Sequence, residues 1–178
     1  MQDNQTSYKD VDKNSIDEIL EKLRKIKDTI KLYSDTDLSE ADTRCKIIDD
    51  IFIDVLGWKE GNIKRESSYR DKDDKTQYID YVFESNKNKF IVEAKKNGVY
   101  FNTVTSVKKL KLNGVLSRDN NTKKALDQAY NYCINKRIDV GCICNGKQII
   151  VFNTNNQGSN RAAYVKYRKY RWGQALTY

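Results

Sequence analysis

The sequence contains no histidine and no proline, and it has only eight glycines among 178 residues. Without histidine, a Ser-His-Asp or Cys-His catalytic group and a mixed Cys/His zinc site are excluded. Without proline and with little glycine, no flexible linker divides the chain. There is no apolar run of about 18 residues and no signal-peptide pattern at the amino terminus, so we expect no contact with a membrane. The length fits one domain with a single core.

Cysteine is scarce and irregularly spaced. The four cysteines are Cys45, Cys133, Cys142 and Cys144, and none of them forms a paired metal-ligand motif. We expect buried, reduced thiols, which indicates a reducing compartment and a cytoplasmic location.

Charge is unevenly distributed along the chain. The net charge is +8, but residues 1–60 hold 10 basic and 15 acidic side chains, whereas residues 61–178 hold 23 and 10. The amino-terminal part therefore carries −5 and the remainder +13. A basic body of this kind favours a polyanionic partner, although simple solubility also accounts for it.

Two amphipathic helices are predicted near the amino terminus. Ser15 with Glu18 forms a capping box for a helix to about Tyr33, and Ser39 with Asp42 starts a second helix that ends at Gly57. The first helix has one apolar stripe: Ile16, Ile19, Leu20, Leu23, Ile26 and Ile30. The second has another: Ile47, Ile48, Ile51, Phe52, Val55 and Leu56. We expect the two helices to pack on a core.

The remaining elements alternate between strands and one helix. Residues 59–76 are charged and are predicted to form an exposed loop. Later elements, from periodicity and turn signals, are hairpin strands at 79–84 and 90–95, a short strand at 99–101, a helix at 122–135, and strands at 140–144 and 148–152. The helix at 122–135 is expected to bury Ala125, Leu126, Ala129, Tyr130, Cys133 and Ile134. Asn145-Gly146 is a strong hairpin-turn signal. This order is typical of an α/β sandwich around a mixed sheet.

Composition suggests three segments: a polar segment at 1–14, a folded domain at 15–158 and a basic aromatic tail at 159–178. The stretch from Arg161 to Tyr178 holds five basic residues, no acid, four tyrosines and Trp172. Such a tail either follows a nucleic acid backbone and stacks on bases or packs against a further domain, and both interpretations remain open. The ending at Arg171-Trp172-Gly173 suggests a piece of a longer protein.

The hairpin at 79–95 places like charges together. A tight turn at Asn86-Lys87 pairs residues whose numbers sum to 173, so Asp80 faces Glu93. Directly opposed like charges are destabilising, and Lys95 points to the same face. The opposite face is apolar and consists of Tyr81, Phe83, Phe90, Val92 and Ala94. Crowded carboxylates indicate a metal site, and the alternative is a solvent-facing strand on which Lys95 merely neutralises Glu93.

Oxygen ligands of this kind suit Mg²⁺, with Mn²⁺ expected to substitute. One or two carboxylates together with a substrate phosphate are sufficient for Mg²⁺. A cation bound by Asp80 and Glu93 would relieve their repulsion, polarise a phosphodiester and lower the pKa of a water. Lys95 would orient or deprotonate that water, or stabilise charge on the phosphate.

Further motifs occur in a fixed order around this hairpin. They are Ser39–Arg44 with Glu40, then Asp80, then Glu93-Ala94-Lys95, then Gln128-Ala129-Tyr130-Asn131-Tyr132, then Cys144-Asn145-Gly146. In order and spacing they resemble the PD-(D/E)XK nuclease superfamily, specifically the amino-terminal nuclease domain of type I restriction enzyme motor subunits. The resemblance covers about Ser39 to Thr154. Ile79 stands where the superfamily name has proline, which many members also lack.

The resemblance implies a restriction-endonuclease-like fold with a central mixed sheet of about four strands flanked by helices. It implies Mg²⁺-dependent cleavage of DNA phosphodiester bonds. The implied metal ligands are Asp80, Glu93, the Ala94 carbonyl and Glu40, the last directly or through water. Lys95 would position the nucleophilic water and Gln128 would complete the catalytic group. The implied nucleic-acid contacts are Arg44, Lys96 and Tyr132, of which Tyr132, like Gln128, could instead hold the site.

Several alternatives stay open. Glu40 lies in the first turn of a helix, where any acid is favourable, and Gln128 with Tyr132 could form a solvated face. Trp58 is expected to belong to the core. The chain has no Gly-rich Lys-Ser/Thr phosphate loop, so a motor, NTPase or recognition function would come from another chain or region. The expected setting is a restriction or anti-phage system, with a homodimer left open. The rival functions are a catalytically silent nucleic-acid-binding or scaffold module and an RNA-directed nuclease.

Overall fold

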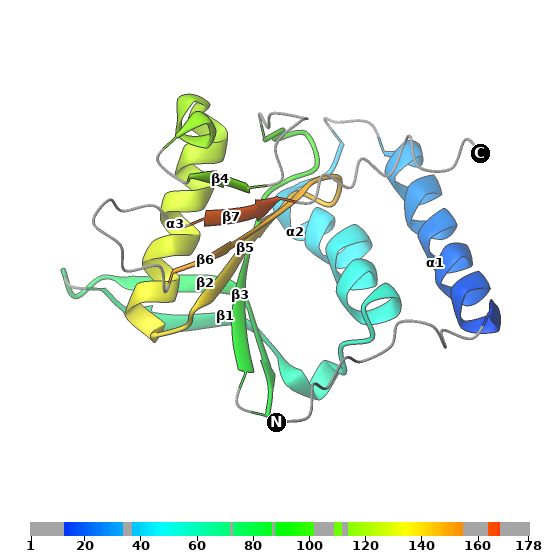
Figure 1. Cartoon of the computed structure of the whole chain (residues 1–178), viewed down its shortest axis with the longest axis horizontal. Coiled ribbons are helices and arrows are strands. Elements are labelled where there is room, and N and C mark those ends of the chain that lie inside the picture. Colours follow the sequence, from blue (N-terminus) through cyan, green and yellow to red (C-terminus); the bar gives the residue numbers. More distant parts are fainter. Residues whose placement is uncertain are drawn as a thin grey trace, which may run out of the picture.

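The structure is a computed structural model of the chain. It describes residues 13–33, 37–71, 73–86, 88–101, 109–111, 114–154 and 164–167. These residues form an α/β fold in which helices cover both faces of a mixed sheet (Figure 1). The expectations for residues 1–12, and those for most of the tail after residue 154, lie outside the described residues.

Five strands make up the body of the sheet. They are β1 (Ile63–Arg70), β2 (Thr76–Ser85), β3 (Asn88–Ala94), β5 (Val140–Cys144) and β6 (Ile149–Asn153). Two short strands, β7 (Tyr164–Tyr167) and β4 (Lys109–Lys111), extend one edge, which gives the order β1-β2-β3-β5-β6-β7-β4. Strands β3 and β5 run parallel, and the other described neighbours are antiparallel. The prediction of about four strands was therefore too low.

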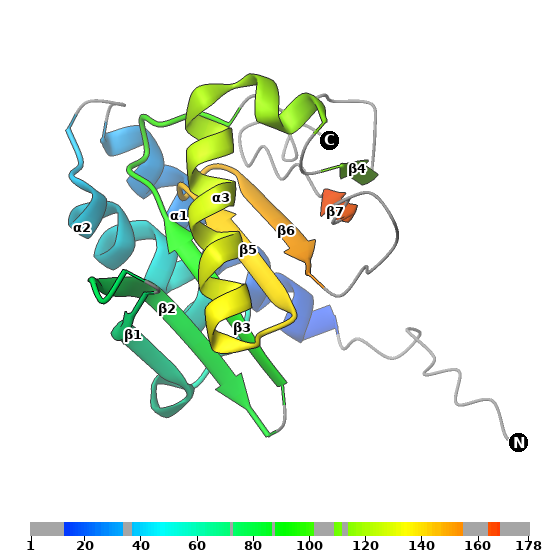
Figure 2. The same cartoon turned by 90° about the vertical axis from the view of Figure 1, so that its left-hand side faces the viewer.

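Helices form three layers around this sheet. Helix α3 (Asn120–Lys136) crosses one face (Figure 2). The other face is covered by α2 (Glu40–Thr43), which continues as two π-helical segments, η1 (Arg44–Ile48) and η2 (Ile51–Val55). Helix α1 (Lys13–Leu32) packs outside η1 and η2. Short 3₁₀ turns, η3 (Glu60–Asn62) and η4 (Val115–Arg118), complete the described helices. None of the described helices is long and apolar enough to cross a membrane.

Two buried clusters lie on opposite sides of the sheet. The cluster beneath α3 includes Ile91, Ile143, Leu126, Ala129 and Phe152. The cluster beneath the other helices includes Ile47, Ile48, Phe52, Phe83 and Val92. The second cluster contains the predicted apolar face of the hairpin, which confirms that assignment. Trp58 packs edge-on against Phe83 and Phe90, with ring centroids 5.2 Å apart in each case, so its predicted place in the core is also confirmed.

Some burial predictions were wrong. Four residues of the predicted apolar stripes are exposed: Ile16, Ile19, Leu56 and Ile134. Cys45 is exposed as well, whereas the other three cysteines are buried free thiols. The polar residue Thr43 is completely buried.

Two elements differ from prediction for a physical reason. Residues 63–70 form a strand rather than a loop. Among the described strands β1 lies at the sheet edge and pairs with β2 alone, a position that needs no apolar alternation. Residues 99–101 form no strand. Instead the Gln148 side chain donates to the Phe101 carbonyl at 2.9 Å and accepts from its amide at 2.8 Å. One amide side chain thus replaces a neighbouring strand. The predicted turn at Asn145-Gly146 is confirmed, with φ +80° at Gly146.

Candidate metal-binding and catalytic site

The hairpin of β2 and β3 has the predicted register. Tyr81 pairs with Val92 and Val82 with Ile91, so the numbers sum to 173 and Asp80 lies opposite Glu93 at the next position. Beyond Tyr81 and Val92, the Asp80 side chain rather than its backbone bonds to β3. Its Oδ2 accepts a hydrogen bond from the Ala94 amide at 2.8 Å. Asp80 is thereby fixed at the open end of the hairpin.

Glu93 is buried, with 1% of its surface exposed. Its Oε1 accepts a hydrogen bond from Lys95 Nζ at 2.5 Å. Its Oε2 is buried and has no hydrogen-bond partner within the described part of the chain. Burial, followed by the nearby Asp80 charge, raises the pKa of Glu93 to about 8. A buried carboxylate oxygen without a partner is unfavourable, so this position requires either a proton or a cation.

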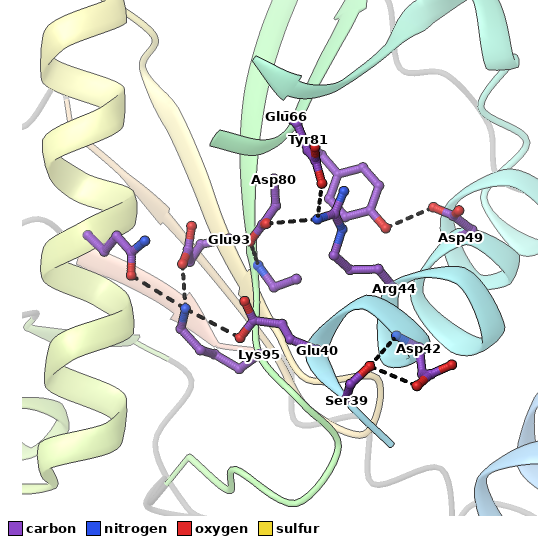
Figure 3. A network of polar contacts seen from close by, with 12 residues as sticks. Ser39, Glu40, Asp42, Arg44, Asp49, Glu66, Asp80, Tyr81, Glu93 and Lys95 are labelled. Atoms are coloured by element: carbon purple, nitrogen blue, oxygen red, sulfur yellow. Dashed lines mark hydrogen bonds and ion pairs between the residues drawn. The ribbon is translucent and has the colours of Figure 1, made fainter. Parts of the chain in front are cut away.

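Lys95 lies where three elements meet (Figure 3). Its Nζ is 2.5 Å from Glu93, 3.4 Å from Gln128 Oε1 on α3 and 3.8 Å from Glu40 Oε2 at the start of α2. Burial works against the charged form, but the Glu93, Glu40 and Asp80 carboxylates outweigh it and raise the pKa of Lys95. Burial also raises the pKa of Glu40. The structure therefore brings all five predicted catalytic residues together.

Gln128 is held by the residue one helical turn later. Its Nε2 donates to the Tyr132 hydroxyl at 2.7 Å, which aims Oε1 at Lys95. Tyr132 is 3% exposed and packs edge-on against Tyr69 at 5.6 Å. These two residues do not form a solvated face. Tyr132 is buried behind Gln128 and hydrogen-bonded to it, and its contact with nucleic acid stays a prediction.

Of the other two predicted nucleic-acid contacts, Lys96 is exposed beside the site and Arg44 is engaged within it. Arg44 Nη1 donates to Asp80 Oδ1 at 3.3 Å and to Glu66 Oε1 at 3.1 Å, so both of its carboxylate partners lie on the sheet. Only 14% of the Arg44 side chain is exposed. Glu66 was missed because residues 59–76 were assigned to a loop. Only recognition of β1 as a strand in register with β2 would have placed it opposite Asp80.

A second layer fixes Arg44. Its guanidinium lies over the Tyr81 ring at 5.3 Å, while the Tyr81 hydroxyl donates to Asp49 Oδ1 at 2.8 Å. Arg65 lies 5.7 Å from the same ring and pairs with Asp49 at 3.2 Å. Residues five apart diverge on an α-helix, but the π-helical turn η1 places Arg44 and Asp49 on the same face. Burial, followed by the Asp49 charge, raises the pKa of Tyr81.

The start of α2 is joined to the turn after Lys95. The Thr43 hydroxyl donates to the Ser39 carbonyl at 2.8 Å and accepts from the Asn97 amide at 3.1 Å. Ser39 itself caps the helix by accepting from the Asp42 amide at 3.0 Å. These bonds fix Glu40 relative to Lys95.

The donor set fits a hard divalent cation. Within the described residues, no three acidic or cysteine side chains gather closely enough to form a metal cage by themselves. Mg²⁺ does not need one, because it binds through one or two carboxylates and retains several waters. Asp80 and Glu93 supply two carboxylates, and a cation would provide the partner that the buried Glu93 Oε2 lacks in the described part of the chain. Oxygen donors without thiolate or imidazole suit Mg²⁺ and Mn²⁺. Glu40 faces Lys95, a position that suits contact through water.

Comparison with known proteins identifies no relative: no family model, no curated protein and no solved structure matches the chain significantly.

Proposed function

We propose that this protein is a Mg²⁺-dependent endonuclease that hydrolyses DNA phosphodiester bonds and has a restriction-endonuclease-like fold. The observation that carries the proposal is the convergence of Asp80, Glu93 and Lys95 at the open end of one hairpin. There a buried Glu93 oxygen has no hydrogen-bond partner among the described residues. A solvent-facing strand with tolerated acids would leave that oxygen in contact with water.

Each residue has a distinct role in the proposed reaction. Asp80 and Glu93 would hold the metal ion, with the Ala94 carbonyl as a third ligand and Glu40 acting through water. When bound, Mg²⁺ supplies charge that polarises the phosphodiester and lowers the pKa of a water. The raised pKa of Lys95 favours the ammonium form, which donates hydrogen bonds to the attacking water or to the phosphate.

Gln128 and the basic surface would complete the site. Gln128 orients the Lys95 ammonium, and Tyr132 keeps the Gln128 amide in place. Arg44 and the exposed Lys96 would face the phosphate backbone. The charge of +8 supports a polyanionic substrate. Sequence recognition or translocation would come from a partner chain or region, in keeping with a restriction or anti-phage system.

A cleavage assay tests the proposal. The purified protein is incubated with duplex DNA, single-stranded DNA and RNA, in Mg²⁺, in Mn²⁺ and in EDTA. Asp80→Ala and Lys95→Ala are compared with Glu84→Ala and Lys89→Ala, which remove the same types of charge from an exposed ion pair in the same hairpin. We expect metal-dependent DNA cleavage that the first two substitutions abolish and the second two leave unchanged.

Other outcomes select the rival functions. Cleavage restricted to RNA, with the same dependence on Asp80 and Lys95, would identify an RNA-directed nuclease. Binding of nucleic acid without cleavage in either metal, even with a natural partner added, would refute the proposed activity and leave a silent binding module.

A further inference from the structure

Three carboxylates form one row across three adjacent strands. Glu66 on β1 lies opposite Asp80 on β2, between the pairs Arg65–Tyr81 and Ser67–Ile79. Asp80 in turn lies opposite Glu93 on β3, one position beyond the terminal pair of that ladder, Tyr81 with Val92. Three like charges in a row repel one another. Asp80 is the centre of the row and is shared by its two halves.

The two halves are neutralised differently. Between Glu66 and Asp80 lies a single nitrogen, Arg44 Nη1, at 3.1 Å from one carboxylate and 3.3 Å from the other. The half between Asp80 and Glu93 contains the buried Glu93 Oε2 that has no partner within the described residues. Lys95 contacts Glu93 through its other oxygen, Oε1. One half therefore holds a side-chain cation, and the other retains a carboxylate oxygen for an ion from outside.

The position of Arg44 is built into the fold. Its side chain is largely buried, and Tyr81, itself held by Asp49, lies under the guanidinium. Glu66 has a φ of +51°, which is uncommon for a residue other than glycine. Such backbone conformations persist where surrounding contacts enforce them. Glu66, which has this conformation, accepts a hydrogen bond from Arg44 Nη1 and so helps to hold Arg44 in place.

We propose that Arg44 is a resident second cation of the site, so that the protein binds one divalent metal ion where the row of three carboxylates would otherwise accept two. Glu66 is a positioning residue that holds Arg44 against Asp80. This inference rests on the proposed function, since it assigns the cations of the same site. In the proposed reaction the Arg44 guanidinium would supply a positive charge beside Asp80 that stabilises negative charge on the phosphate.

Metal stoichiometry tests the proposal without measuring activity. Mn²⁺ is titrated into the 178-residue chain without nucleic acid, and free Mn²⁺ is followed by its electron paramagnetic resonance signal. We expect one ion in the wild type and two in Arg44→Met. Adding Glu66→Gln to Arg44→Met should return the number to one, since the second ion needs that carboxylate. Arg65→Met is the matched control, because Arg65 also lies over Tyr81 but contacts no carboxylate of the row. It should retain one ion.

Two results would overturn the inference. Two ions in the wild type would show that Arg44 does not take a metal position, and one ion in a folded Arg44→Met protein would show that its removal opens none. Circular dichroism and thermal unfolding establish whether each variant is folded, and Arg44→Gln is the second variant if Arg44→Met is not. One ion in Arg44→Met with intact wild-type DNA cleavage refutes this inference alone. No Mn²⁺ bound to the wild type, together with no cleavage, refutes the proposed function as well.

Discussion

The stability of the metal-free protein should fall as the pH rises, because of the buried carboxyl group of Glu93. Burial and the Asp80 charge raise its pKa from 4.5 to about 8. In the unfolded chain the pKa is ordinary, so between pH 4.5 and about pH 8 the folded state holds a proton that the unfolded state has released. The stabilisation is complete below this range and is lost as the pH rises through it.

The magnitude follows from the size of the pKa change. One pKa unit corresponds to about 1.4 kcal/mol, so this carboxyl alone should lower the free energy of unfolding by about 4 kcal/mol between pH 4.5 and pH 8. Glu93→Gln keeps the size of the side chain and is neutral throughout. The variant should match the wild type at the acidic end of the range and exceed its stability by about that amount at pH 8.

Urea denaturation in EDTA at several pH values measures this difference. At pH 8, added Mg²⁺ should stabilise the wild type and leave Glu93→Gln unchanged, because the ion binds only the folded carboxylate site. Glu84→Gln is the control, since Lys89 and Lys64 lower the pKa of that exposed acid. If the free energies of unfolding of the wild type and Glu93→Gln differ by the same amount at both ends of this pH range, this account of Glu93 is refuted.

Three further results are expected. Gly146→Ala should destabilise the protein by about 2 kcal/mol in urea denaturation, because the new Cβ would lie 2.7 Å from Ile47 Cγ2 at a φ of +80°. Gly61→Ala, with nothing within 4 Å, should change stability by less than about 0.5 kcal/mol, and equal losses would contradict the steric explanation. Tyr132→Phe removes the hydroxyl that accepts a hydrogen bond from the Gln128 amide, so it should lower the cleavage rate about tenfold without changing the number of Mn²⁺ ions bound. An unchanged rate would show that Gln128 does not depend on this hydrogen bond. DNA affinity should fall steeply with salt, and a salt-insensitive interaction would indicate a protein partner for the basic surface.

Local patterns in the sequence were sufficient to predict the centre of the site, where Asp80 lies opposite Glu93. Alternation of apolar residues and a short turn specified the register that sets Asp80 opposite Glu93, and helix caps placed the start of α2 at Ser39. Glu40 and Gln128 are far from Lys95 in sequence, so no spacing rule could bring them to its ammonium group. The family resemblance placed them there, and the structure shows them in contact with it.

Local patterns failed where long-range contacts decide the structure. Strand β1 buries Ile63 and leaves its other residues exposed or half-buried, so its sequence shows no apolar alternation. Without that strand, the pairing of Glu66 with Arg44 could not be foreseen. Residues 99–101 have good strand composition, yet the side chains of Asn145 and Gln148, in the turn between β5 and β6, bind their backbone. Amino-acid composition cannot show that the Gln148 side chain bonds the Phe101 backbone in place of a neighbouring strand.

The order in which the site assembles follows from its chain topology. Asp80 and Glu93 meet through a hairpin, a local contact that forms early and rapidly when a protein folds. The partners of Lys95 come from α2 and α3, and their contacts close long loops that form later. A partly folded chain would therefore contain the paired acids Asp80 and Glu93 before the ammonium group of Lys95 is oriented. On the proposed function, a newly synthesised chain cannot cut DNA until both helical layers have docked on the sheet.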